Sequence, residues 1–248
     1  MRSLLFLFVV FHAGISFSQT SAAAADSSLV EAGIPALGRE WSGADYLQAA
    51  KVLAEGKVPL PRLTDEQGRL FLQRLTTTDN FSRYRDSTLP LEKRLPDYFN
   101  LLTGATAILK EYLAAADKKL DVHREFAQQL AFGMRMAAMG VQLMDEYLPT
   151  IPKDDKYETR MAGMKRAYGG LMTMYGGAEA SLSDTRFFSP SDLTLLVSTM
   201  AETLPVVKKG FSADYKAEFR KKLESHRTTF TDAEGAKALQ QMIDEFGA

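Results

Sequence analysis

The chain has 248 residues, a formal net charge of −1, and 46% apolar against 25% charged residues. This composition is typical of a globular protein and not of a disordered one. The balanced charge shows neither the basic excess of nucleic-acid binders nor an acidic excess suited to a cationic partner. The chain has no cysteine, which excludes disulfides, thiolate metal sites and lipid attachment through a cysteine.

The first 25 residues have the three parts of a secretory signal peptide. Arg2 supplies the positive start, an apolar run extends from Leu4 to Ile15, and a tail rich in Ser and Ala follows. Cleavage is expected after Ser18 or after Ala25. Because the apolar run is short for a membrane span, we favour a cleaved signal over an uncleaved anchor. We therefore expect an exported protein, periplasmic or extracellular, with no membrane span in the mature chain.

Residues 26–41 are small and polar and are interrupted by Pro and Gly, which predicts a linker. From residue 42 to 248 the apolar residues recur at helical spacing, and no segment alternates in the manner of a strand. We predict an all-α fold, namely a single bundle of long antiparallel helices with shorter helices at the N-terminus and C-terminus. Within this single helical domain, residues 42–88 could form a small cap.

Several helix starts can be placed from their capping residues. Capping-box patterns occur at Ser42 with Asp45, Thr64 with Gln67, Ser189 with Asp192, and Thr231 with Glu234. Asp121 and Ser212 are predicted to cap two further helices. The longest helices are expected from about residue 90 or 96 to 118, from 121 to 148 and from 154 to 182.

The segment 154–182 is predicted to be the central helix of the bundle. Its apolar residues keep heptad spacing, and they are Tyr157, Met161, Met164, Tyr168, Leu171, Tyr175, Ala178 and Leu182. Small residues recur on the other side, and they are Ala162, Gly163, Gly169, Gly170, Gly176 and Gly177. Because each glycine costs about 1 kcal/mol relative to Ala in a helix interior, we expect another backbone to pack closely against them.

The sequence shows no motif of a known catalytic site. It lacks the GxSxG elbow, the HExxH zinc motif and a phosphate-binding loop. Of the three histidines, His12 lies in the predicted signal peptide, His123 is expected at the surface, and His226 is expected half-buried in the core. The carboxylates are not paired as acid–base catalysis would require. We therefore predict no catalytic residue, no metal ligand and no bound cofactor.

The adjacent Phe187 and Phe188 fall in a predicted loop. They could tuck under the bundle or present a contact patch to a partner. The candidate contact residues for a ligand or partner are Met161, Met164, Tyr168, Tyr175, Phe187, Phe188 and His226.

Three functional hypotheses follow. The leading one is an exported, non-enzymatic helical bundle that binds a partner protein or a small apolar ligand. The first alternative is a haem or copper protein that uses Met residues and His226. The second is an enzyme whose site is assembled from the scattered residues Asp145, Arg166, Tyr168 and Tyr175. The sequence does not predict the partner or the oligomeric state.

Overall fold

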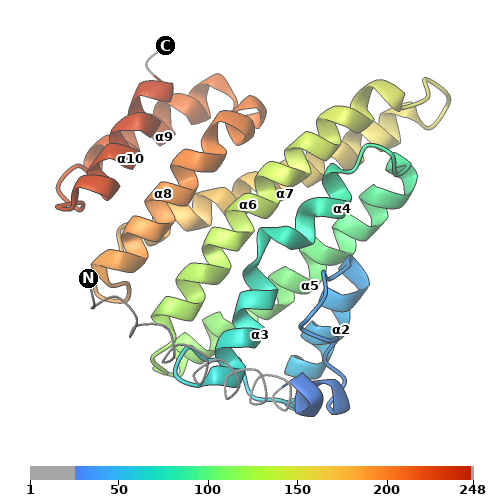
Figure 1. The fold of residues 1–248 in the computed structure, drawn as a ribbon. Coiled ribbons are helices and arrows are strands. Elements are labelled where there is room, and N and C mark those ends of the chain that lie inside the picture. Colours follow the sequence, from blue (N-terminus) through green and yellow to red (C-terminus); the bar gives the residue numbers. More distant parts are fainter. Residues whose placement is uncertain (1–25, 247–248) are drawn as a thin grey trace, which may run out of the picture.

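A computed structural model describes residues 26–246, without the side chains at positions 171 and 174 (Figure 1). The regular secondary structure of this range is entirely helical, which confirms the all-α prediction. The predicted signal peptide lies outside the described residues. None of the helices between residues 26 and 246 is both long and apolar enough to span a membrane.

The helices begin and end at residues close to those predicted. Residues 26–31 are helical. The helices that follow are α2 Gly43–Ala54, α3 Glu66–Thr76, α4 Ser82–Arg85, α5 Leu91–Asp117, α6 His123–Tyr147, α7 Tyr157–Ser181, α8 Pro190–Val207, α9 Ala213–Ser225 and α10 Ala233–Glu245. Three short 3-10 turns join them, and they are η1 Thr78–Phe81, η2 Leu148–Thr150 and η3 Lys208–Gly210.

Two of the predicted capping boxes are present. At α2 the Ser42 hydroxyl accepts a hydrogen bond from the Asp45 amide, and the Asp45 carboxylate accepts one from the Ser42 amide. Ser189 and Asp192 make the same reciprocal pair at α8, where Pro190 occupies the first helical position. Both boxes satisfy backbone donors that the first helical turn would otherwise leave without partners.

Other helix starts differ from the prediction by one residue. Asp65 caps α3 and Asp232 caps α10, each directly after the predicted threonine. Their carboxylates accept the amide of the glycine three positions on, at 2.6 and 2.7 Å, and a charged acceptor forms a stronger hydrogen bond than a hydroxyl. Asp121 is not the cap of α6, because Val122 occupies that position and no side chain caps this helix.

The helix around which the others are arranged is α6, and not the predicted segment 154–182. It packs against α5, α7 and α8 (Figure 1). Its buried residues belong to all three hydrophobic clusters of the described chain, for example Phe132 in the first, Met134 in the second and Val141 in the third. Helix α6 therefore buries residues on several sides, whereas the outer side of α7 is polar or small.

The predicted linker, residues 26–41, packs into the core. Leu29, Ile34 and Trp41 are buried in the same cluster as the inner residues of α2, α3, α5 and α6. The Trp41 amide donates to Asn80 Oδ1 at 2.8 Å, and its indole donates to the Ala36 carbonyl at 2.9 Å. This segment is therefore an integral part of the folded region.

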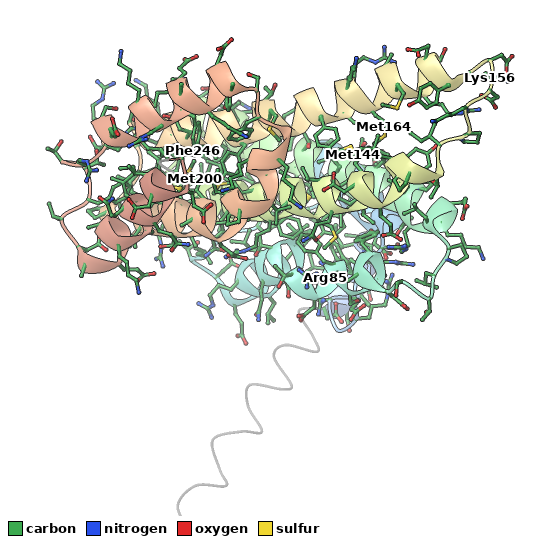
Figure 2. All side chains as sticks on the ribbon, turned by 90° about the horizontal axis from the view of Figure 1, so that it is seen from above. Arg85, Met144, Lys156, Met164, Met200 and Phe246 are labelled. Atoms are coloured by element: carbon green, nitrogen blue, oxygen red, sulfur yellow. The ribbon has the colours of Figure 1, made fainter. Side chains whose placement is uncertain are left out.

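Among the glycines of α7, only Gly176 has a close neighbour within residues 26–246, the Tyr215 side chain, whose hydroxyl oxygen would lie 3.3 Å from an added Cβ atom. A Cβ atom placed on Gly163, Gly169, Gly170 or Gly177 would meet nothing within 4 Å in the described part of the chain. The close backbone contact predicted for this side is absent there. The opposite side of α7 faces α6, where Met164 and Met144 share a buried cluster (Figure 2).

Candidate functional site

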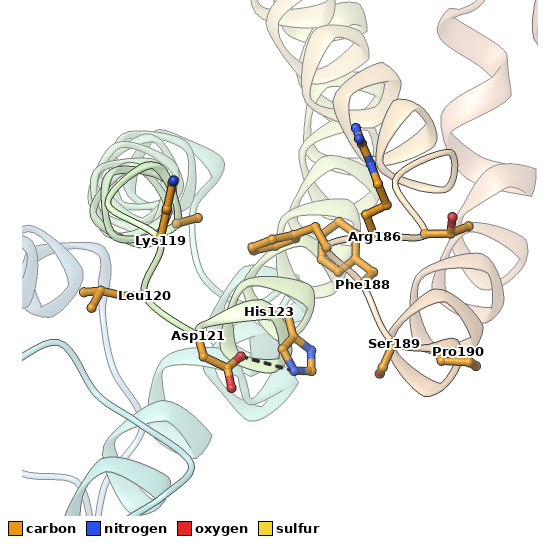
Figure 3. Close-up of a pocket in the computed structure, with 11 residues that line it drawn as sticks. Lys119, Leu120, Asp121, His123, Arg186, Phe188, Ser189 and Pro190 are labelled. Atoms are coloured by element: carbon orange, nitrogen blue, oxygen red, sulfur yellow. Dashed lines mark ion pairs between the residues drawn. The ribbon is translucent and has the colours of Figure 1, made fainter.

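An open hollow lies where the turn between α5 and α6 meets the loop between α7 and α8 (Figure 3). Its volume of about 620 Å³ is within the range of small-molecule sites. The turn contributes Ala116, Lys119, Leu120, Asp121 and His123, and the loop contributes Thr185, Arg186, Phe187, Phe188, Ser189 and Pro190.

Two phenylalanines form an apolar wall of the hollow. The rings of Phe187 and Phe188 meet edge to face with their centroids 4.8 Å apart, and Phe126 of α6 stacks on Phe188. The backbone is fixed by Asp184, whose carbonyl accepts the amide of Phe188 at 3.0 Å. Phe188 is buried and Phe187 is half-buried, so the predicted aromatic pair is both tucked into the core and present at the surface of the hollow.

Lys119 stands at a position that normally favours glycine. Helix α5 ends in a Schellman motif, in which the Leu120 amide donates to the Ala115 carbonyl and the Lys119 amide donates to the Ala116 carbonyl. Lys119 therefore has a φ of 60°, in the left-handed region. A side chain there costs about 1 kcal/mol or more, and strain of this kind is often found at functional sites.

His123 is held between two carboxylates. Its Nδ1 lies 2.5 Å from Asp192 Oδ2, and its Nε2 lies 3.3 Å from Asp121 Oδ1. Asp192 is buried, and the same Oδ2 atom also accepts the amide and the hydroxyl of Ser189. Both carboxylates can accept from the ring only when each nitrogen carries a proton. Asp192 thus fixes the orientation of the ring, and Nε2 faces the exposed Asp121.

Two cations lie on opposite walls of the hollow (Figure 3). Within residues 26–246, neither Lys119 nor Arg186 has an ion-pair partner. The hollow therefore combines an aromatic wall, two free cations and a histidine whose orientation is fixed. Such a set can bind a molecule with a flat apolar body and a negatively charged group.

The other candidate contact residues lie elsewhere. Met161 is half-buried and Met164 is buried in the cluster between α6 and α7. The Tyr168 hydroxyl donates to Asp145 Oδ1 at 2.7 Å, and its burial together with that hydrogen bond raises its pKa. Tyr175 is fully buried and donates to the Met200 carbonyl at 2.8 Å, and burial raises its pKa as well.

The scattered residues of the enzyme hypothesis do not converge. Asp145 and Tyr168 are hydrogen-bonded to each other, but Tyr175 is sealed in the core and Arg166 lies exposed on α7. The structure therefore does not assemble the proposed four-residue site.

His226 is a buried structural partner of Glu179. Its Nε2 lies 3.3 Å from Glu179 Oε1, and Lys222 lies 3.8 Å from the other carboxylate oxygen. This cluster ties α9 to α7. Nε2, one of the two ring nitrogens that could ligate haem or copper, is thus engaged by a carboxylate. Among the described residues, no group of three or more His, Asp or Glu side chains is placed to hold a metal ion.

Sequence reasoning identified the aromatic pair of the hollow but missed its polar residues. His123 and Asp192 are 69 positions apart, and each has an ordinary local explanation as a surface residue or a helix cap. No sequence pattern shows that Lys119 adopts a left-handed conformation.

In comparisons with known proteins, no family model, curated protein or solved structure matches the chain.

Proposed function

We propose that the chain is an exported, non-enzymatic bundle of long antiparallel helices that binds a small, largely apolar ligand in the hollow beside Phe187 and Phe188. The observation that carries the proposal is an aromatic pair held rigidly against an open hollow of about 620 Å³. Leu120, which is 51% exposed, extends this apolar surface. Because the rings are already fixed by packing, a ligand would bind without the cost of ordering them.

Binding can be tested with the neutral dye N-phenylnaphthylamine, whose fluorescence rises in apolar surroundings. The mature chain should bind it saturably, and Phe187→Ala should weaken binding about tenfold through the loss of one ring contact. Phe99→Ala is the matched control, because Phe99 is an exposed phenylalanine on α5 outside the hollow. Equal loss in both variants, or no saturable binding, would refute the proposal.

Export can be tested separately by expressing the 248-residue chain in a bacterium. The mass of the protein recovered outside the cytoplasm is then measured by mass spectrometry. The expected mass is that of a chain beginning at Gln19 or at Asp26. A protein of full mass that stays in the cytoplasm would refute export and leave the binding proposal standing.

Partner-protein binding is a second candidate, which one observation favours. Phe99 and Leu113 are exposed and lie fourteen positions apart on one side of α5. Exposed apolar residues aligned in this way are typical of a helix that packs against another. A photo-crosslinker at Leu113 should then give one defined adduct in the native exported fraction, and one at the exposed Leu89 should give none.

A further inference from the structure

The polar residues of the hollow narrow the class of ligand, provided that the hollow binds ligands as proposed above. We infer that it selects apolar molecules that carry one anionic group, and that this group binds at His123 Nε2 in the place where the Asp121 carboxylate lies. The shared chemistry is that of an oxyanion, such as a carboxylate or a sulfonate.

The first step of the argument is the fixed direction of the His123 ring. Asp192 is buried and accepts three hydrogen bonds at one oxygen, from the amide and hydroxyl of Ser189 and from His123 Nδ1. An acceptor with three donors and a place in a helix cap does not exchange its partner easily. Nε2 is therefore the ring atom that is left to contact a ligand.

The second step is the loose attachment of Asp121. Its side chain is 85% exposed, and its one charged contact within the described residues is His123 Nε2 at 3.3 Å. The hydrogen bond from Arg62 goes to the Asp121 backbone carbonyl and does not hold the carboxylate. Since an exposed pair of this kind contributes little, an incoming anion can displace the carboxylate at low cost.

The third step is the surplus of positive charge once Asp121 moves away. Lys119 and Arg186 flank the aromatic wall and have no acidic partner in the described chain. Two other carboxylates lie beside the hollow: Asp192 is engaged by His123, and Asp184 Oδ1 accepts the Phe187 amide. An anionic group beside His123 would then share the hollow with the two cations, and its apolar body would rest on Phe187.

A matched pair of dyes isolates the anionic group. Anilinonaphthalene sulfonate has the ring system of N-phenylnaphthylamine with one added sulfonate. The wild-type chain should bind the sulfonate dye more tightly than the neutral dye. Asp121→Asn should tighten binding of the sulfonate dye about fivefold, since it removes a competing charge, and should leave the neutral dye unchanged.

Lys119→Gly gives the complementary test without a risk to folding. The substitution relieves the left-handed strain, so the midpoint of urea unfolding should rise, while binding of the sulfonate dye should weaken about fivefold. Lys118→Gln is the matched control, because Lys118 is the neighbouring cation and does not line the hollow. This substitution should leave the binding of both dyes unchanged.

The outcomes separate the two proposals. If Asp121→Asn and Lys119→Gly change the affinities for the two dyes equally or not at all, selection for an anion is refuted. Phe187-dependent binding of the neutral dye would still support the proposed function. If neither dye binds in a manner that depends on Phe187, both proposals fail.

Discussion

The helical glycines at the α2–α5 crossing and those of α7 have different surroundings. Where α2 crosses α5, a Cβ atom on Gly104 would lie 2.5 Å from the Tyr46 carbonyl carbon, and one on Gly43 would overlap the Asp97 carbonyl oxygen. In α7, a Cβ atom on Gly169 or Gly170 would meet nothing within 4 Å in the described chain. Recurring glycines in a helix therefore do not by themselves show that a neighbour packs there.

The difference has a physical basis in the surroundings of each helix. The α2–α5 crossing brings two backbones together, and the Gly43 amide donates to the Asp97 carboxylate at 3.1 Å (Figure 1). Helix α7 packs mainly on α6 through its larger side chains, and Gly169 and Gly170 are exposed. Substitutions should accordingly have opposite signs in the two regions.

The largest effect is expected for Gly104→Ala. The added methyl group would collide with the backbone of Tyr46 and Leu47, which cannot rotate away as a side chain can. We expect the free energy of unfolding to fall by about 3 kcal/mol, at the upper end of overpacking effects. Urea unfolding followed by circular dichroism measures it. A loss below about 1 kcal/mol would show that the crossing is looser than described.

Removal of the Asn80 side chain in the same region should also lower the free energy of unfolding. Asn80 is buried, its Oδ1 accepts the Trp41 amide at 2.8 Å, and its Nδ2 donates to the Tyr46 hydroxyl at 2.7 Å. Asn80→Ala leaves the buried Trp41 amide without its acceptor and removes the donor to the Tyr46 hydroxyl, so the free energy of unfolding should fall by about 2 kcal/mol. The exposed Asn100 provides the control. An equal loss in Asn100→Ala would contradict this explanation.

The cap of α2 adds a pH dependence. Burial raises the pKa of Asp45, but hydrogen bonds from Arg39 and Ser42 outweigh it and lower the pKa to about 2. The unfolded chain has a pKa of about 3.9, so this stabilisation is present above that pH and is lost as the pH falls to about 2. Asp45→Asn should cost about 1 kcal/mol at pH 7, typical of a cap.

Urea unfolding at several pH values measures that loss. The difference between wild type and Asp45→Asn should shrink as the pH falls from about 4 to about 2. Asp117→Asn is the control, since Asp117 is exposed and has no partner in the described chain. A constant difference over this range would show that the carboxylate charge is not what stabilises the cap.

These cases also show how much could be predicted from the sequence. The capping boxes at Ser42 and Ser189 were predicted because they depend on four consecutive residues. The identity of the central helix could not be predicted, because α6 and α7 both show helical periodicity. Only the packing of the whole fold decides which of the two is enclosed. Only the aromatic part of the hollow could be predicted. Phe187 and Phe188 are adjacent in sequence, whereas His123 and Asp192 meet only in the fold.

The smallest effect is the one that tests the comparison most directly. Gly169→Ala and Gly170→Ala replace glycine by the best helix former on the open side of α7, where no atom obstructs the methyl group. The free energy of unfolding should rise by about 0.5–1 kcal/mol, because the unfolded chain loses freedom. Urea unfolding and the mass of the native species should be measured together. If alanine instead lowers stability or changes that mass, another surface covers α7 in solution, and its glycines are then contact residues like those of the α2–α5 crossing.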